Sequence, residues 1–216
     1  MHAHVTALTA DLRRIFGPRL TSLVAYGEPN DEDGVHTLAL VDRLTFEDLA
    51  ACAPQIPSWR RSGAAVPLLL SREEFLRTLD VFPIEYGNII ARHVVLAGDN
   101  PFAGMAVNDG DLRRACELQV KSHLIHLREG YLESGGDSGS VARLISSSAE
   151  SLKALIANIE RLDPAAAANS GLTSALVQEV AAAHTTTIAD PSALFSRYLS
   201  AVERLWHEVD RWREGR

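Results

Sequence analysis

The sequence lacks the features that place a protein in a membrane, on a secretory route or on nucleic acid. Among its 216 residues, no apolar stretch reaches the roughly 18 residues that a transmembrane helix needs. Residues 1–16 hold no apolar run of about seven or more, which argues against a signal peptide. Lys and Arg number 21 against 28 Asp and Glu, and an acidic surface disfavours phosphate backbones and anionic lipids. We expect a cytoplasmic protein with no nucleic-acid or membrane partner.

Cysteine is scarce, and so are metal-ligand patterns. Cys52 and Cys116 are the two cysteines, and without a metal-ligand spacing they are expected to be reduced, buried thiols. His123 and His126 lie three residues apart, but zinc needs three or four converging ligands. We interpret both as helix-packing histidines and predict no metal site. The glycine-rich phosphate loops and the nucleophile elbow of hydrolases are missing as well.

What the sequence does contain is 46% hydrophobic residues, enough for a globular protein with a core. Its pattern changes near residue 105. Before that point, short strand-like and helical runs alternate. The expected order is helix 3–16, strand 20–26, strand 36–42, helix 45–53, strand 66–70, helix 72–78 and an interrupted strand 82–96.

After residue 105 the sequence is nearly all helical. Apolar residues recur in steps of three and four, and short polar stretches interrupt them. Helices are predicted at about 111–134, 140–162, 171–184 and 191–213. Short breaks favour antiparallel neighbours and therefore a four-helix bundle. The predicted fold class is α+β, with a small mixed-sheet domain at 1–104 and an antiparallel helical bundle at 105–216.

One stretch of the first domain, AYGEPNDEDGVHTLALVD, points to a possible site. An apolar strand ends at Gly27, an acidic loop follows, and a second apolar strand begins within ten residues. This layout resembles the nucleotidyltransferase superfamily with a polymerase-β-like core, particularly its kanamycin-nucleotidyltransferase-like and minimal branches. The family signature is an apolar strand, Gly-Ser, a loop, and Asp-x-Asp on the next strand, with a third carboxylate on a later strand.

The resemblance implies a magnesium- and ATP-dependent chemistry. Residues two apart on a strand point the same way, so the paired aspartates hold Mg²⁺ for the triphosphate and the attacking hydroxyl. In this sequence Gly27 matches the glycine, but Glu28 replaces the serine. The Asp-x-Asp positions read Gly34-Val35-His36. Because neither ligand position is a carboxylate, we predict no catalytic residue and no cofactor from the direct alignment.

A shifted alignment gives an active alternative. It takes Asp31 and Asp33 as the metal pair and needs Gly34 inside the strand, where glycine is unfavourable. The third carboxylate would be Asp80 or Glu85. Only in this alternative are Mg²⁺ and ATP expected, for adenylyl transfer to a small hydroxylated acceptor.

Arg113 is a further candidate, because its helical angle places it on the inward face of the first bundle helix. A buried arginine needs a partner, and Glu85 or the loop at 27–33 would serve. The ligand-binding candidates are therefore Gly27, Glu28, His36, Glu85 and Arg113.

Three hypotheses follow. The preferred one is a non-catalytic protein with a nucleotidyltransferase fold, a pseudoenzyme that binds a nucleotide or small ligand in the interdomain cleft. The second is the active enzyme that uses Asp31, Asp33 and Glu85. The third is a structural protein that forms a homodimer through its helical bundle.

Overall fold

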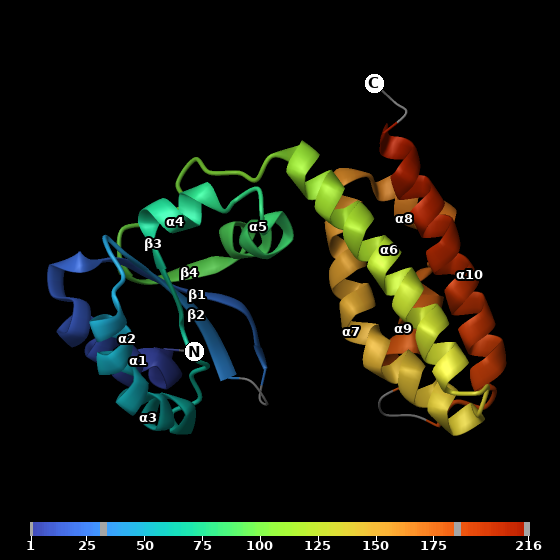
Figure 1. Cartoon of the computed structure of the whole chain (residues 1–216), viewed down its shortest axis with the longest axis horizontal. Coiled ribbons are helices and arrows are strands. Elements are labelled where there is room, and N and C mark those ends of the chain that lie inside the picture. The colour runs from blue at the N-terminus through green and yellow to red at the C-terminus, as the bar shows by residue number, and fades with distance from the viewer. Residues whose placement is uncertain (1, 31–33, 184–186, 214–216) are drawn as a thin grey trace. The chain divides into compact units, whose positions relative to one another are not determined.

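The computed structural model describes residues 2–30, 34–183 and 187–213. The chain divides into two compact units, Met1–Asn108 and Asp109–Arg216 (Figure 1). The first unit contains a four-stranded sheet with helices, and the second is helical. The predicted α+β class is confirmed. None of the described helices is long and apolar enough to cross a membrane.

The sheet of the first unit has the order β3-β2-β1-β4. The strands are β1 (Leu20–Asn30), β2 (Gly34–Val41), β3 (Leu68–Ser71) and β4 (His93–Gly98). β1 pairs antiparallel with both β2 and β4, whereas β2 and β3 are parallel. The sheet is therefore mixed. A parallel pair needs a crossover connection, and two short helices between β2 and β3 supply it.

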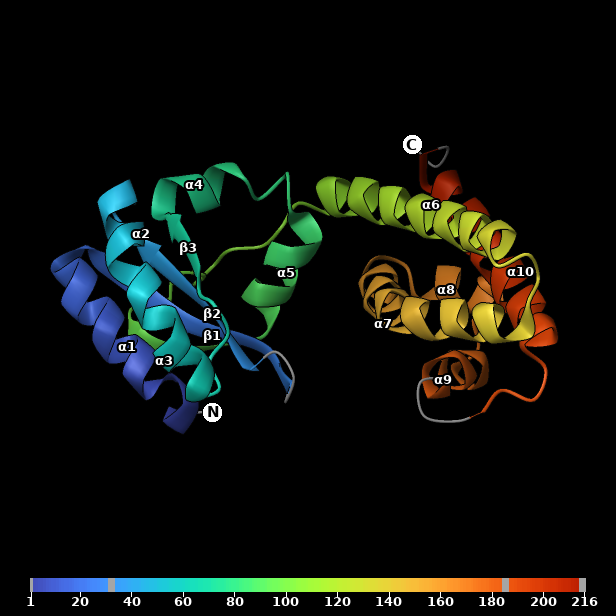
Figure 2. The same cartoon turned by 60° about the horizontal axis from the view of Figure 1, so that its bottom comes forward.

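Helices cover both faces of this sheet (Figure 2). They are α1 (His2–Phe16), α2 (Phe46–Cys52), α3 (Ile56–Arg61), α4 (Arg72–Arg77) and α5 (Pro83–Ala91). One apolar cluster joins α1, α2 and α3 to Leu23 and Ala39 of the sheet. The other joins α4 and α5 to Val24 and Leu38. Alternate strand residues thus supply two separate cores, as the period of a strand requires.

The predicted strand 82–96 is wrong over Pro83–Ala91, which forms helix α5, and is confirmed over 93–96, which belong to strand β4. Pro83 lies in the first turn of α5, where its fixed φ favours helix and its missing N–H has no cost. Tyr86 and Ile89 are buried three residues apart, which is helical spacing. The β-branched residues of the segment suggested a strand, but this packing overrides their propensity.

The second unit contains five α-helices within the described residues, not four. They are α6 (Asp109–Glu133), α7 (Ser138–Leu162), α8 (Pro164–Ser170), α9 (Ser174–Ala182) and α10 (Pro191–Asp210). The unpredicted α8 begins where the Asp163 side chain accepts a hydrogen bond from the N–H of Ala165. Capping of this kind restarts a helix directly after a break. Both cysteines are free and buried, as predicted.

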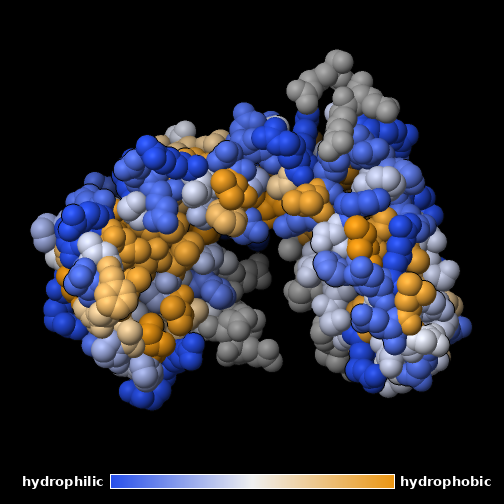
Figure 3. Space-filling model, viewed as in Figure 1, coloured by the Kyte–Doolittle hydropathy of each residue, from blue (hydrophilic) through white to orange (hydrophobic). Residues whose placement is uncertain are grey.

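Apolar side chains also reach the surface of both units, as the orange areas of Figure 3 show. On α6, Leu118, Ile125 and Leu132 follow one another at intervals of seven residues and are exposed. Residues seven apart lie on nearly the same side of a helix. This exposed row differs from the buried stripe of α6, to which Leu112, Cys116 and others belong.

Candidate functional site

A row of three ring side chains crosses the sheet next to Gly27. Tyr26 on β1 is the register partner of His36 on β2 and also of His93 on β4. Register partners point to the same face of a sheet. Tyr26 packs against the apolar cluster of α4 and α5, so the row lies on that face. We call His36, Tyr26 and His93 the ring row.

The members of the ring row differ in whether their polar atoms have hydrogen-bond partners. Tyr26 and His36 are stacked, with ring centroids 5.8 Å apart and planes 28° from parallel. His93 contacts the Ile90 carbonyl through Nδ1 and Asn100 Oδ1 through Nε2, each at 3.1 Å. His36 has no hydrogen-bond partner among the described residues and is half-buried. Within the described part of the chain, its ring nitrogens are available to a ligand.

Burial keeps Tyr26, the central member of the ring row, uncharged. It raises the pKa of Tyr26 above the ordinary value of 10.0, because the phenolate would lose hydration. Tyr26 is therefore a neutral hydroxyl at physiological pH. It supports the His36 ring and can donate a hydrogen bond, but it supplies no negative charge to a cation.

Gly27 follows the ring row directly and adopts a φ of +73°. A side chain is strained in this conformation, which explains the glycine. A Cβ built at Gly27 would meet nothing within 4 Å. The backbone is therefore open to a close neighbour, as the family resemblance implies for this position. The side chain of Glu28, and all of Asp31 and Asp33, lie outside the described part of the structure.

β2 carries no carboxylate anywhere from Gly34 to Val41. Its residues on the α5 side of the sheet are His36, Leu38 and Leu40. Gly34, the first residue of β2, has a φ of +79°. No group of three or more His, Cys, Asp or Glu that could hold a metal occurs among the described residues. A magnesium pair on this strand has no ligands.

Two other predicted positions need correction. Glu85 is exposed in the first turn of α5 and does not lie on a strand, as the third carboxylate of the family should. Arg113 is exposed on α6, whereas its neighbour Leu112 is buried. The helical angle gives the direction in which a side chain leaves the helix, and does not determine whether the end of that side chain is buried. A long arginine in the first turn of a helix can extend its charged end into solvent.

Gly27 and His36 were ligand-binding candidates from the sequence and stay predictions, whereas Tyr26 and His93 were not among the candidates. Cross-strand neighbours follow from register, and β4 was hidden inside the wrongly predicted strand 82–96. Two signals in the sequence could have separated β4 from α5. From Pro83 the apolar residues have helical spacing, and after His93 a run of β-branched and aliphatic residues follows.

Comparison with known proteins supports the fold. No family model matches this sequence, and no curated protein matches it at a significant level. Among solved structures, the spectinomycin adenyltransferase AAD(9) from Enterococcus faecialis, determined with ATP and spectinomycin, matches with a TM-score of 0.55. The match covers 97% of this chain and 99% of that chain at 11% identity. The chain therefore has a nucleotidyltransferase-like fold, and identity this low shows the fold alone.

Proposed function

We propose that this protein is a non-catalytic member of the nucleotidyltransferase-like fold that binds a nucleotide without magnesium. The observation that carries the proposal is the absence of any Asp or Glu on β2 from Gly34 to Val41. Magnesium and its ligands supply much of the charge stabilisation in nucleotidyl transfer, and its loss costs several powers of ten in rate.

The ring row has side chains suited to binding a nucleotide and none suited to nucleotidyl transfer. The stacked Tyr26–His36 pair presents flat surfaces, and aromatic and imidazole rings pair well with planar bases. The nitrogens of His36, which no described residue contacts by a hydrogen bond, can bond to a base or a ribose hydroxyl. The open backbone at Gly27 permits a close approach. The fold match to a protein determined with ATP supports the choice of a nucleotide.

The acidic loop disfavours a highly charged ligand. Glu28 follows Gly27 directly, and residues 31–33 add three more acidic positions. Without a metal, a triphosphate placed beside these residues is repelled. We therefore expect adenosine or AMP to bind at least as tightly as ATP.

A thermal-shift titration with adenosine, AMP and ATP, with and without Mg²⁺, tests the binding. The expected result is stabilisation by at least one of the three that does not depend on Mg²⁺. His36→Ala should remove it. His207 is an exposed histidine of α10 in the other unit. His207→Ala is therefore the matched control and should keep the stabilisation by nucleotide.

A pyrophosphate-release assay tests the lack of catalysis. The protein is incubated with ATP, Mg²⁺ and a panel of hydroxylated acceptors that includes spectinomycin. We expect no release above the blank. Turnover that Asp31→Ala or Asp33→Ala abolishes would establish the active alternative, and Glu85→Gln would then show whether Glu85 takes part. The absence of any nucleotide-induced shift would instead favour the structural alternative.

A further inference from the structure

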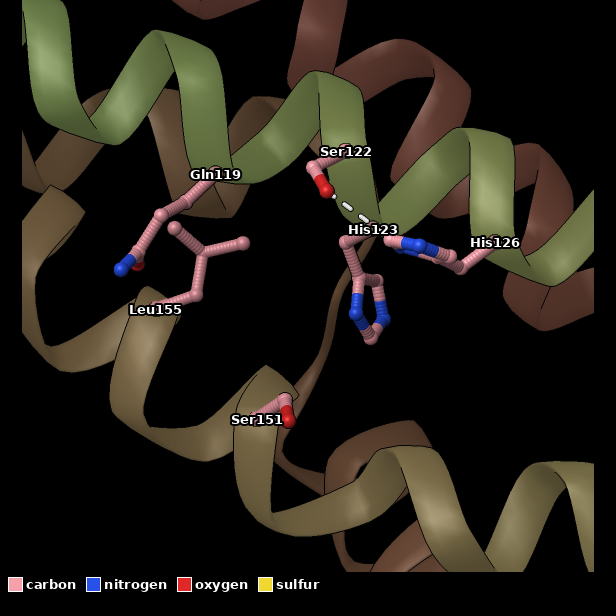
Figure 4. Close-up of a pocket in the computed structure, with 6 residues that line it drawn as sticks. All are labelled: Gln119, Ser122, His123, His126, Ser151 and Leu155. Carbon is pink, nitrogen blue, oxygen red and sulfur yellow. Dashed lines mark hydrogen bonds between the residues drawn. The ribbon is translucent and has the colours of Figure 1, made fainter.

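A cavity of about 360 Å³ lies between α6 and α7, entirely within the second unit. Its described lining consists of Gln119, Ser122, His123, His126, Ser151 and Leu155 (Figure 4). In that view the His123 ring extends from α6 toward α7 and lies close to Ser151. The volume is within the range of small-molecule sites, roughly 300 to 1,000 Å³.

A chain of hydrogen bonds ends at His123. Ser148 Oγ lies 2.8 Å from the Ile145 carbonyl and donates to it. We therefore assign the donor of the 3.1 Å contact between Ser148 Oγ and the Tyr198 hydroxyl to Tyr198. In this assignment the Tyr198 oxygen accepts from His123 Nε2, 2.6 Å away. It places the proton of a neutral His123 on Nε2.

The remaining nitrogen of His123 is a hydrogen-bond acceptor. Burial, followed by the nearby His126, lowers the pKa of His123 to about 4, so the ring is neutral at neutral pH. With its single proton assigned to Nε2, Nδ1 is an acceptor. Among the residues the structure describes, Nδ1 has no partner. Within the described residues, Thr37 Oγ1 is the one fully enclosed side-chain N or O atom that lacks a hydrogen-bond partner. His123 Nδ1 lacks a partner among these residues but is not fully enclosed. A molecule in the cavity can therefore reach it.

Two serines and a glutamine supply most of the other polar groups of the lining. Ser151, Ser122 and Gln119 each offer both donors and acceptors, while Leu155 supplies an apolar wall. The described lining contains no Lys, Arg, Asp or Glu, so an ionic ligand would lose hydration without gaining a counter-charge.

We propose that this cavity binds a neutral polyol about the size of a monosaccharide, with one hydroxyl donating to His123 Nδ1. A polyol carries several hydroxyls that both donate and accept, which matches serine and amide partners. Its C–H groups can pack against Leu155. The inference is independent of the proposed nucleotide site, because all the residues involved belong to the other unit.

Ligand-observed NMR titration of the full chain tests the proposal. The probes are glucose, ribose and inositol, with glucosamine and glucuronate as charged counterparts. We expect saturable binding of at least one neutral probe and binding of its charged counterparts that is weaker by about tenfold or more. Two-bond ¹⁵N–¹H spectra of the histidines should show His123 protonated on Nε2, and the bound probe should shift its Nδ1 signal.

Two serines of α7 give a matched pair of variants. Ser151→Val removes a lining hydroxyl and should weaken probe binding about tenfold. Ser147→Val makes the same exchange one turn earlier on α7, at an exposed residue outside the cavity, and should bind within about twofold of wild type. Both residues are exposed, so either variant should fold, which thermal melting verifies.

Several outcomes overturn the proposal. They are the absence of saturable binding by any neutral probe, equal binding of the charged counterparts, and equal effects of Ser151→Val and Ser147→Val. A His123 spectrum with the proton on Nδ1 would remove the acceptor on which the argument rests. Gln119→Leu provides an independent check, because it changes the opposite helix and should also weaken binding.

Discussion

Thr37 on β2 is 1% exposed, and its hydroxyl has no hydrogen-bond partner among the described residues. A buried polar atom without a partner keeps its full desolvation cost. Thr37→Val replaces the hydroxyl with a methyl group of similar shape. We expect the variant to raise the free energy of unfolding by about 1 kcal/mol.

Urea denaturation of wild type and Thr37→Val measures this difference. Thr21→Val is a suitable control, because Thr21 donates to the Leu40 carbonyl at 2.9 Å and should lose stability instead. A lower stability for Thr37→Val would show that its hydroxyl is hydrogen-bonded in solution.

Asp48 in α2 links helix capping to an ion pair. Its carboxylate accepts two hydrogen bonds from the Arg19 guanidinium, at 2.7 and 2.9 Å, and one from the Thr45 N–H at 3.0 Å. These bonds, those of Arg19 first, lower its pKa from the ordinary 3.8 to about 2. A depressed carboxyl pKa stabilises the fold above pH 3.8, and this contribution is lost as the pH falls toward 2.

Asp48→Asn should therefore lower the free energy of unfolding at pH 7 by on the order of 2 kcal/mol. The difference from wild type should shrink between pH 4 and pH 2, roughly the window that the two pKa values bound. Thermal melts at a series of pH values measure it. A difference that stays constant over this range would mean that folding does not lower the pKa of Asp48.

At the scale of elements, the start of β2 is fixed by backbone packing. Gly34 has a φ of +79°, and a Cβ there would lie 2.6 Å from the Gly63 carbonyl oxygen. The adjacent Val35 N–H donates to that same oxygen at 2.8 Å. Gly27 has a similar φ of +73°, but its Cβ would meet nothing.

These two glycines separate conformational strain from steric clash. Gly27→Ala should lower the free energy of unfolding by about 1 kcal/mol, because alanine is strained at a left-handed φ. Gly34→Ala adds a backbone collision and should cost about 3 kcal/mol or more. Chemical denaturation of both variants measures the gap. Equal losses would show that the contact at Gly63 relaxes without cost.

α5 shows what element-level reasoning can miss. Ile84, Ile89 and Ile90 have strong strand propensity, and a strand was the natural interpretation of residues 82–96. The proline at the start and the burial of one helical face decided otherwise. The same error displaced Glu85 from a strand to an exposed helical turn, so a site candidate was lost together with the element that was expected to carry it.

At the scale of the whole molecule, the homodimer expected from the helical unit remains a prediction. The exposed row of Leu118, Ile125 and Leu132 is its most direct basis. If the row associates with a second copy, Leu118→Glu combined with Leu132→Glu should convert a dimer to a monomer. Light scattering coupled to size exclusion measures the mass. A wild-type monomer at all accessible concentrations would contradict the prediction.

The sequence by itself determined the fold class, most elements and the missing carboxylates of β2. These depend on local information: the period of apolar residues, capping residues and residue identity along one strand. Only the tertiary structure decided that His93 lies beside Tyr26 and that His123, Tyr198 and Ser148 form one chain of hydrogen bonds. His123 and Tyr198 are 75 residues apart in the sequence. Contacts of this kind depend on strand register and helix packing, which no short stretch of sequence encodes.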